Sequence, residues 1–336
     1  MIPLSPQGLQ PEQWQQDLAD AFNSPRELLE FLALDQADLA GVDLDQANPF
    51  PLRVPRYFAR LMRSGDPHDP LLRQVLPMQA EHSAEPGYAS DPVGDLNALR
   101  DTALLQKYRG RALAITTGAC AVHCRYCFRR HFPYAEQSLL RHWQSTLETL
   151  AAMPDVDELI LSGGDPLSLS DRRIATLLAD TARLTRLRRL RLHTRLPVVL
   201  PGRVTPALCA MLQECGLAVV VVIHANHPNE ITRELGAALA ALRGAGATLL
   251  NQAVLLKDIN DSADTLVRLS ESLFSAGVLP YYLHLLDPVA GAAHFDVDES
   301  RAKALLAQLS ASLPGYLVPK LVREVPGAPN KVTVTA

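Results

Sequence analysis

The sequence predicts an α/β fold in which parallel strands form a partial (βα)6 barrel of the TIM type. From Arg111 onward, short apolar runs rich in β-branched residues alternate with amphipathic segments of helical length, which is the pattern of βα units. Several of these runs are continuously apolar, as expected for strands covered on both faces of a parallel sheet. Six such units predict a barrel or part of one, with an active site at the carboxyl ends of the strands.

The expected strands and helices alternate along the chain. The strands are predicted at residues 112–117, 158–162, 189–193, 217–224, 248–255 and 281–286. The helices are predicted at residues 138–152, 171–184, 205–215, 228–244, 261–276 and 298–312. This order is the one expected of a parallel sheet with helices on its faces.

Residues 1 to about 105 have a different pattern, in which breakers separate short helical segments. Helices are predicted at residues 11–22, 25–34 and 55–63. In the second of these, Ser24 stands at the N-cap and Pro25 at the first helical position. Prolines and glycines interrupt residues 66–95 too often for long elements, so this stretch is expected to be irregular and to pack on a larger body.

Length and composition place the chain among globular proteins. Its 336 residues allow two domains, or one barrel with an extension, at roughly 150 residues per domain. Hydrophobic residues make up 48% and charged residues 20%, which excludes disorder as the main state. A net charge of -4 gives no overall basic field for nucleic acid or anionic lipid. The apolar runs are too short for a membrane span and the start does not resemble a signal peptide, so a cytoplasmic protein is expected.

Three of the five cysteines form a C-x3-C-x2-C run directly after the first expected strand: Cys120, Cys124 and Cys127. A disulfide framework does not suit a chain without a secretion signal. A structural zinc site would require a fourth ligand, which His123 or His131 could supply. A four-iron cluster needs only three thiolates and leaves one iron open, as catalytic metal sites leave a position for substrate. The other two cysteines lie on a predicted helix and are expected to be buried thiols.

The segment Gly118-Ala-Cys-Ala-Val-His-Cys-Arg-Tyr-Cys-Phe-Arg-Arg-His-Phe resembles the cluster loop of radical S-adenosylmethionine (SAM) enzymes. Its Arg-Arg-His-Phe continuation is similar to the lysine 2,3-aminomutase family. Within that family, the chain most resembles the short bacterial members that make (R)-β-lysine for attachment to translation elongation factor P. The similarity includes Leu52-Arg-Val-Pro, Asp69-Pro-Leu-Leu-Arg-Gln-Val-Leu, Tyr281-Tyr-Leu-His and Gly291-Ala-Ala-His-Phe.

This resemblance implies a division of the chain into three parts. Residues 106–315 would form the radical SAM type of partial barrel. Residues 1–105 would form a helical and irregular extension packed on it, and residues 316–336 a C-terminal segment that carries a cofactor-binding lysine.

The resemblance also implies how the iron–sulfur cluster and SAM are bound. Cys120, Cys124 and Cys127 would hold a [4Fe–4S] cluster, and its open iron would bind SAM. The second expected strand ends in Gly163, Gly164 and Asp165, where glycines permit close backbone approach to a ligand. From the sequence alone this is equally an ordinary turn capped by Asp165, whereas the resemblance makes all three residues SAM contacts.

Two polar residues at other strand ends are implied in the same pocket. His224 ends the fourth expected strand and Gln252 lies on the fifth, so both are expected at the mouth of the barrel. A single strand-end histidine more commonly has a structural hydrogen bond. The resemblance assigns both residues to the pocket for SAM and pyridoxal 5′-phosphate (PLP).

PLP requires an amine for its resting Schiff base. Lys331 alone would be taken for a solvated tail lysine, but the resemblance makes it the Schiff-base lysine. It follows Pro326-Gly-Ala-Pro-Asn, which has one glycine where longer homologues have several. Tyr108 matches a family tyrosine near the cofactor, and Lys107 stands where the family often has an arginine that could pair with phosphate.

The substrate lysine would be held at both of its ends. Arg129 matches the family arginine that binds the substrate carboxylate, a role suited to a guanidinium fork. Asp287 and Glu324 match the two acids that bind the side-chain ammonium, with Glu324 standing where larger aminomutases have aspartate. Without the resemblance, each acid would be taken for a surface or turn carboxylate.

The implied activity is that of an isomerase, L-lysine 2,3-aminomutase, which converts (S)-α-lysine to (R)-β-lysine through a 5′-deoxyadenosyl radical with PLP. Its implied partners are L-lysine, a flavodoxin- or ferredoxin-type electron donor, and elongation factor P with its lysyl-transferring ligase. One alternative is a radical SAM enzyme that acts on another amino acid or without PLP. A second is a zinc-bearing binding or scaffold module.

Overall fold

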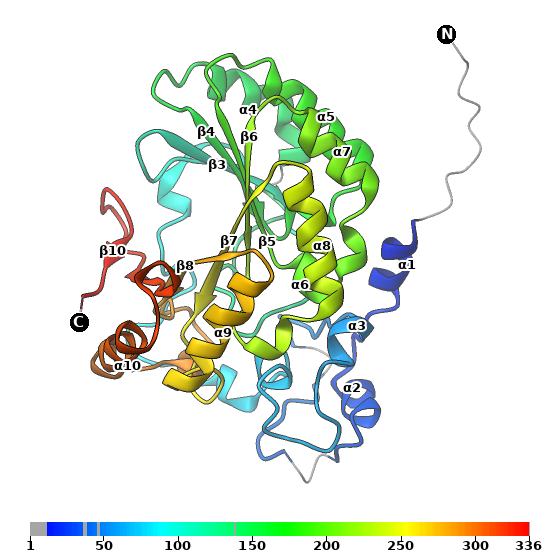
Figure 1. The fold of residues 1–336 in the computed structure, drawn as a ribbon, viewed down its shortest axis with the longest axis vertical. Helices are drawn as coiled ribbons and strands as arrows, with labels where there is room; N and C mark the ends of the chain where they lie inside the picture. The colour runs from blue at the N-terminus through cyan, green and yellow to red at the C-terminus, as the bar shows by residue number, and fades with distance from the viewer. Residues whose placement is uncertain (1–11, 36–38, 46–47, 138, 336) are drawn as a thin grey trace.

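One ten-stranded sheet organises the chain, with its strands in sequence order from β1 to β10 (Figure 1). The computed structural model describes residues 12–35, 39–45, 48–137 and 139–335. The strands are β1 (Leu99–Asp101), β2 (Leu104–Leu105), β3 (Arg111–Thr117), β4 (Glu158–Gly163), β5 (Arg189–Thr194), β6 (Ala218–Ile223), β7 (Thr248–Val254), β8 (Leu279–His284), β9 (Lys320–Arg323) and β10 (Val332–Thr333). Strands β3 to β9 are parallel neighbours, and the three remaining pairings, at the two edges, are antiparallel.

Helices cover the outer face of the parallel strands (Figure 1). They are α4 (Leu139–Ala151), α5 (Asp171–Ala182), α6 (Leu196–Val199), α7 (Pro206–Glu214), α8 (Arg233–Gly244), α9 (Ala263–Ser275) and α10 (Glu299–Ser312). Among the described residues, the edge strands β1 and β10 do not pair with each other, so the barrel is open. The predicted α/β class and partial (βα)6 barrel are confirmed, and each of the six expected strands lies within two residues of its predicted bounds.

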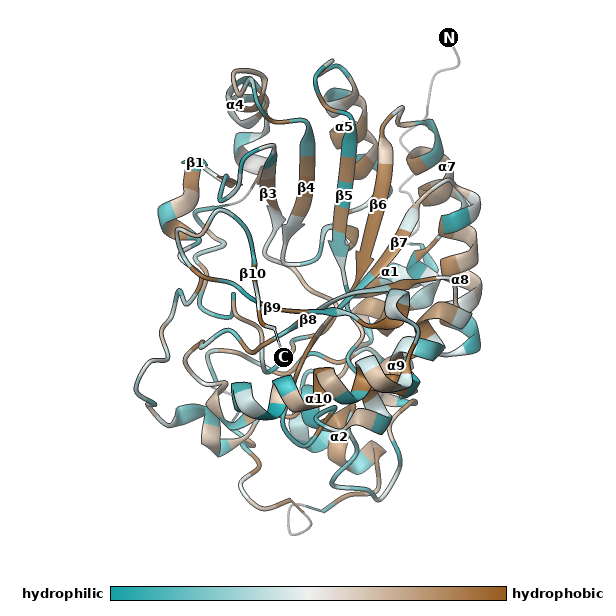
Figure 2. Cartoon of the chain, turned by 60° about the vertical axis from the view of Figure 1, so that its left-hand side comes forward, coloured by the Kyte–Doolittle hydropathy of each residue, from teal (hydrophilic) through white to brown (hydrophobic). Residues whose placement is uncertain are grey.

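The alternation of side chains along β5 makes the barrel interior polar at one place. Strand β6 is hydrophobic over most of its length, whereas β5 is largely hydrophilic (Figure 2). In β5, Leu190 and Leu192 are buried under the outer helices, and Arg191 and His193, which alternate with them, line the interior cavity. Because successive strand residues point to opposite faces, this sequence puts a cation and an imidazole inside the barrel.

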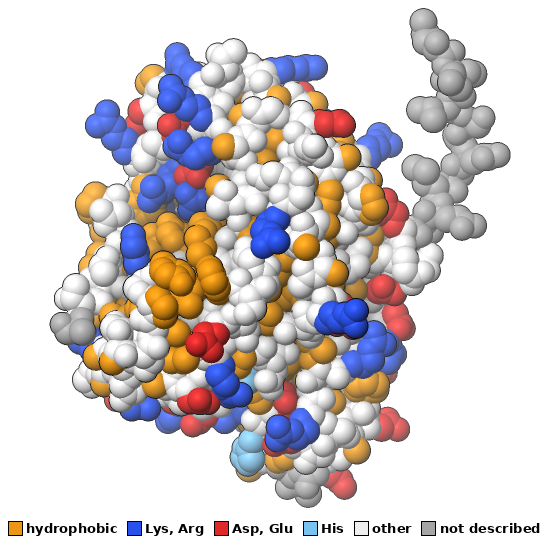
Figure 3. Space-filling view, in the orientation of Figure 1, with side chains coloured by type: hydrophobic (Ala, Val, Ile, Leu, Met, Phe, Trp, Pro, Cys, Tyr) orange, Lys and Arg blue, Asp and Glu red, His pale blue; other side chains and the backbone are white. Residues whose placement is uncertain are grey.

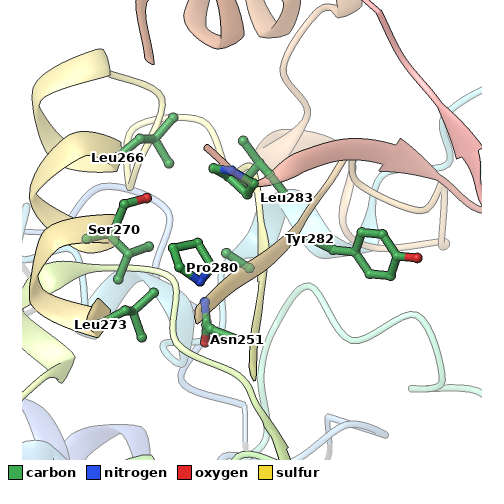
Figure 4. A pocket seen from close by; sticks show the side chains of 10 residues that line it. Asn251, Leu266, Ser270, Leu273, Pro280, Tyr282 and Leu283 are labelled. Carbon is green, nitrogen blue, oxygen red and sulfur yellow. The ribbon is translucent and has the colours of Figure 1, made fainter. Parts of the chain in front are cut away.

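Helix α9 packs on β7 and β8 through the spacing of its apolar residues. Leu266, Ser270 and Leu273 point from the helix toward Pro280 and Leu283 of β8, around a small gap (Figure 4).

Tyr282, on the same strand as Pro280, points away from α9 (Figure 4). The ladder pairs Pro280 with Asn251 and Tyr282 with Gln252, which leaves Tyr281 as an extra residue. Such a β-bulge moves the side chains of the residues that follow it to the opposite face of the sheet. Tyr282 and His284 therefore line the barrel interior.

The extension before β3 contains three short helices and an unexpected hairpin. The helices are α1 (Gln13–Ala19), α2 (Pro25–Phe31) and α3 (Arg56–Ala59), all shorter than predicted. Ser24 and Pro25 occupy the predicted N-cap and first helical positions. Residues 66–95 are irregular as expected, with two 3₁₀ turns, Leu72–Gln74 and Gln79–His82.

The prediction of only helices and irregular structure before residue 105 is wrong at β1 and β2. Leu104 and Leu105 pair with Ala114 and Leu113 of β3 and are buried there. The turn between the two strands places Ala103 at φ 67°, without the glycine or asparagine that normally signals such a turn. Strands β9 and β10 were also not expected. They have four and two residues, too short to show a periodic pattern.

The molecular surface has no uniform charge. Charged side chains of both signs are scattered over the face in Figure 3, with lysines and arginines gathered toward its upper end and hydrophobic side chains grouped below them. Among the described residues, no helix has the length and apolar character needed to cross a membrane.

Candidate functional site

An open cavity fills the barrel interior at the carboxyl ends of the strands. It is lined by every site residue predicted from the sequence: Lys107, Tyr108, Cys120, Cys124, Cys127, Arg129, Gly163, Gly164, Asp165, His224, Gln252, Asp287, Glu324 and Lys331. These residues come from seven strands or the loops after them and from the C-terminal segment, so the fold brings together residues more than 200 positions apart.

The three cysteines lie on the loop after β3 and are all half-buried. Burial raises the pKa of Cys127 to about 11, with a further increase from neighbouring Cys124. Burial also raises the pKa of Cys120 well above its ordinary value. Metal ligands must be thiolates, so a bound cationic cluster would compensate the cost that burial imposes here. The donor set therefore fits a thiolate-bound metal group.

The cysteines are not arranged for a single metal ion. In the described part of the chain, no three His, Cys, Asp or Glu side chains are grouped closely enough to share one ion. The thiolates of an iron–sulfur cluster, in contrast, each bind a different iron. Cys209 and Cys215, expected to be buried thiols, lie elsewhere, and only Cys215 is fully buried.

A buried carboxylate holds the cysteine loop to the irregular extension. Glu81 accepts a hydrogen bond from Arg125 Nε at 2.8 Å and pairs with Arg130 Nη2 at 2.6 Å. Burial raises the pKa of Glu81, but the hydrogen bond and charge of Arg125, together with Arg130, outweigh it and lower the pKa. Arg125 also donates to the Phe50 carbonyl at 2.7 Å. Sequence reasoning did not identify Glu81 as important.

The glycines after β4 permit close approach to the cysteine loop. Gly164 N donates to the Thr117 carbonyl at 2.6 Å, and a Cβ on Gly164 would lie 2.4 Å from the Ala119 carbonyl oxygen. Gly163 has φ 115°, a conformation that L side chains rarely adopt. Both glycines also line the cavity, so their predicted approach to a ligand stays a prediction, and the structure adds a close contact with the backbone before the cysteines.

The Asp165 carboxylate accepts its hydrogen bonds from the protein's own loops after β4 and β5. Its two oxygens accept hydrogen bonds from Leu167 N, Thr194 Oγ1, Arg195 N and Leu196 N, at 2.7 to 3.0 Å. This is the capping alternative raised from the sequence. Asp165 thus ties the loop after β4 to the loop after β5, and its contribution to a SAM site would come from its backbone.

A series of alternating charges runs along one wall of the cavity. Arg129 Nε lies 2.6 Å from Asp95 Oδ2, and Lys107 Nζ lies 2.7 Å from Asp95 Oδ1. Lys107 also lies 3.6 Å from Glu324 Oε1, and Lys331 Nζ lies 2.5 Å from Glu324 Oε2. The sequence analysis missed Asp95, which lies in the irregular extension and joins two of its predicted cations.

Tyr108 and Arg111 lie beside this series. Tyr108 donates its hydroxyl to Glu324 Oε1 at 2.5 Å, and burial followed by this bond raises the pKa of Tyr108. The Arg111 guanidinium stacks 4.5 Å from the centre of the Tyr108 ring. Among the described residues, Arg111 has no carboxylate within salt-bridge distance, so it is available to an anionic group. Sequence reasoning also missed Arg111.

Asp287 is a carboxylate of the cavity wall with a strongly raised pKa. Burial raises its pKa to about 7, with Lys331 opposing and Glu324 adding to the effect. It is half-buried at the cavity wall. An ammonium group that enters the cavity would therefore stabilise the negative charge of the Asp287 carboxylate, which the protein itself pairs only weakly.

Three histidines from β5, β8 and the end of β6 face the interior. His224 Nε2 lies 2.7 Å from Gln252 Nε2, and burial lowers the pKa of His224 to about 3. His193 and His284 also have lowered pKa values because of burial. The Nε2 atoms of His193 and His284 are buried with no hydrogen-bond partner among the described residues. The cavity thus offers neutral imidazoles, two of them with an unused nitrogen.

Substitution of Gly164 by alanine tests the contact between the β4 turn and the cysteine loop. Because the added Cβ would meet the Ala119 carbonyl, the loop must shift, at a cost of about 1–3 kcal/mol. We expect Gly164→Ala to bind less iron after anaerobic reconstitution and to unfold at lower denaturant concentration. Gly202→Ala is the control, since nothing lies within 4 Å of its added Cβ. Wild-type iron content and stability in Gly164→Ala would contradict this account.

The raised pKa of Asp287 predicts a pH-dependent difference in stability. Because folding raises this pKa to about 7, stability from the protonated carboxyl is fully present below about pH 4 and is lost as pH rises to about 7. Asp287→Asn is neutral throughout, so at pH 8 it should be more stable than wild type, by up to about 4 kcal/mol.

The measurement is urea unfolding at pH 8 and near pH 4, where the difference between Asp287→Asn and wild type should disappear. The exposed Glu271→Gln should show no such trend. An equal effect of Asp287→Asn at both pH values would show that this carboxyl is not the titrating group.

Comparisons with known proteins show what the chain is similar to. Residues 114–269 match the model of the Radical SAM superfamily. L-lysine 2,3-aminomutase of Escherichia coli (strain K12) is 48% identical over 321 residues, which cover 95% of this chain and 94% of that protein. L-lysine 2,3-aminomutase of Haemophilus influenzae is 43% identical and covers 98% of both chains. Among solved structures, a radical SAM methyltransferase from Sphaerobacter thermophilus gives a TM-score of 0.44 at 17% identity, over 66% of this chain and 68% of that one.

Two relatives with this identity over nearly their whole lengths establish the family independently of the cavity. The expectation taken from the cysteine loop is therefore confirmed. The chain belongs to the lysine 2,3-aminomutase family of radical SAM enzymes, and it is an isomerase.

Proposed function

We propose that the protein converts (S)-α-lysine into (R)-β-lysine, using a [4Fe–4S] cluster, SAM and PLP. The observation that carries this proposal is the convergence of three groups on one cavity: the cysteine loop, Lys331, and the carboxylates of Asp287 and Glu324. Radical transfer between SAM and an amino acid held by PLP requires that both be bound in one water-excluding space. The relatives carry the name L-lysine 2,3-aminomutase, which supports lysine as the substrate.

The cluster and SAM would occupy the part of the cavity next to β3 and β4. Cys120, Cys124 and Cys127 would supply three thiolates, and bound SAM would supply the radical that removes hydrogen from the substrate. The backbone of residues 163–165 borders this space, and Gly163 is held in place because its carbonyl accepts the Tyr134 hydroxyl at 2.9 Å. His224 and Gln252, which contact each other at 2.7 Å, would provide further polar contacts.

Lys331 would carry PLP, which when bound holds the substrate nitrogen while it moves from the α-carbon to the β-carbon. In the structure the Lys331 ammonium lies against Glu324, so Glu324 is placed to accept the proton that Lys331 must lose before it reacts as an amine. For the phosphate, Arg111 is available and Lys107 is already shared by two carboxylates. We therefore extend the predicted role of Lys107 and Tyr108 to include Arg111.

The substrate lysine would lie between Arg129 and the two acids. Arg129 uses Nε for Asp95 and Nη1 for Ser162, which leaves donors of its fork for a carboxylate. Asp287 would bind the side-chain ammonium, which lowers the pKa of Asp287 and favours its charged form. Glu324 would join it once Lys331 no longer carries a positive charge and Glu324 has passed the accepted proton to solvent.

The cellular role is proposed from the resemblance. The product would supply β-lysine for modification of elongation factor P through its lysyl-transferring ligase, in the cytoplasm. A flavodoxin- or ferredoxin-type protein would deliver the electron that cleaves SAM.

The test is an anaerobic assay of the reconstituted protein with SAM, PLP, a strong reductant and L-lysine, with chiral separation of the products. We expect (R)-β-lysine from the wild type and at least a thousandfold loss of rate in Cys124→Ala and Lys331→Ala, since each removes a group on which the chemistry depends. Lys303→Ala, on the outer face of α10, is the control and should retain activity.

Two outcomes would contradict parts of the proposal. Formation of 5′-deoxyadenosine with lysine unchanged would mean that the substrate is another molecule. Full activity of Lys331→Ala would mean that PLP is not held at this lysine.

A further inference from the structure

Arg195 is a buried arginine at the end of β5 that sequence reasoning did not identify. Its side chain lines the cavity and is almost entirely shielded from solvent. Its Nη1 lies 2.7 Å from Cys124 Sγ and also donates to the Tyr126 hydroxyl. Its Nη2 donates to Gln74 Oε1 at 2.7 Å and to Glu230 Oε2 at 3.2 Å. The guanidinium thus connects the cluster loop, through Cys124 and Tyr126, to the two segments that contain Gln74 and Glu230.

The backbone of Arg195 is fixed independently of its side chain. The Asp165 carboxylate accepts hydrogen bonds from Arg195 N at 2.7 Å and from Leu196 N at 2.9 Å. These bonds set the turn after β5. The guanidinium therefore reaches Cys124 from a rigid attachment and does not depend on the cysteine for its place.

Glu230 is held equally firmly. Its Oε1 accepts Asn226 N at 2.9 Å, His227 N at 3.0 Å and Gln74 Nε2 at 3.1 Å. Only Oε2 faces Arg195, at the longer distance of 3.2 Å.

The charge of Arg195 is only partly neutralised by its carboxylate partner. The Arg195 guanidinium lies closer to the Cys124 sulfur, at 2.7 Å, than to its carboxylate partner Glu230, at 3.2 Å. Arg195 Nε is buried without a hydrogen-bond partner among the described residues. Burial lowers the pKa of Arg195, but Cys124, Tyr126 and Glu230 outweigh it and raise the pKa. Arg195 therefore has one N–H donor and part of its positive charge still available. These suit a group at Cys124 that carries more negative charge than a single thiolate.

Reduction of an iron–sulfur cluster adds one electron to a group that is already anionic with its thiolates. Hydrogen bonds to the sulfur atoms and nearby positive charge stabilise the added charge, and they are among the factors that set the reduction potential of such clusters. A donor to one thiolate sulfur therefore favours the reduced state. A carboxylate beside that donor has the opposite effect.

We propose that Arg195 is a positioning residue that stabilises the reduced cluster through its contact with the Cys124 sulfur, and that Glu230 limits this effect. The inference rests on the proposed binding of a cluster by Cys120, Cys124 and Cys127. Arg195 thereby sets how readily the cluster accepts the electron that SAM cleavage requires.

The test is a redox titration of the reconstituted, SAM-free protein, followed by electron paramagnetic resonance of the reduced cluster. In Arg195→Gln we expect the ratio of reduced to oxidised cluster at a fixed potential to fall by about tenfold, a shift of about 59 mV to more negative potential for one electron. Arg195→Lys, which keeps the charge, should lie between Arg195→Gln and the wild type. Arg188→Gln, an exposed arginine just before the same strand, is the matched control and should not shift the potential.

Glu230→Gln provides a second measurement that does not alter Arg195 or the cysteine loop. We expect it to shift the potential in the opposite direction, toward more positive values. If Arg195→Gln fails to retain iron, this variant decides the question alone.

The outcomes separate this inference from the proposed function. A wild-type protein that binds no cluster would refute the proposed function. A wild-type cluster together with unchanged potentials in Arg195→Gln and Glu230→Gln would overturn the inference about Arg195 only. Weaker SAM binding with an unchanged potential would also overturn it, since that result would assign Arg195 to SAM.

Discussion

The cavity depends on the buried ion pairs that Glu81 makes with Arg125 and Arg130. The cysteine loop after β3 has no regular secondary structure, and its internal backbone bonds, such as that from Cys127 N to the Cys124 carbonyl at 3.0 Å, are local and do not attach it to the rest of the fold. Glu81 and the Phe50 carbonyl fix the arginines from one side, and Gly164 approaches the loop from the other. Removing one partner of a buried ion pair costs about 3–5 kcal/mol, because the remaining charge is left unpaired. The irregular extension is thus part of the site, although it lies outside the barrel.

The cost of leaving a buried charge unpaired also accounts for the arrangement of charges on the cavity wall. A buried cation needs a carboxylate close by, and the protein supplies Asp95 for Arg129 and Lys107, and Glu324 for Lys107 and Lys331. Asp287 is the exception, since burial leaves its pKa at about 7. Each of these three cations therefore has a carboxylate partner before any ligand enters, and the place for one further cation is beside Asp287. This arrangement suits a substrate with an ammonium group at one end and a carboxylate at the other.

The part of this structure that the sequence could predict is the part with a local pattern. Continuous apolar runs such as that of β6 identify parallel strands, and the rule that their carboxyl ends form the site brings His224, Gln252 and Asp287 together. Lys331 carries no local signal of its own, and the resemblance to a family was needed to single it out. Asp95, Glu81 and Arg195 were missed for a physical reason. Each acts through a partner at least 34 positions away, and such contacts leave no periodicity in the sequence. The β1–β2 hairpin was missed because Ala103 occupies a turn position where glycine or asparagine is the usual signal.

The central claim is that one cavity holds the cluster, SAM and the PLP-bound substrate together. The most direct measurement is a crystal structure of the anaerobically reconstituted protein with SAM, PLP and L-lysine. The account predicts a cluster on Cys120, Cys124 and Cys127, PLP beside Lys331, and the lysine ammonium between Asp287 and Glu324. Density for the cluster and SAM in the cavity, with PLP bound elsewhere or absent, would contradict it.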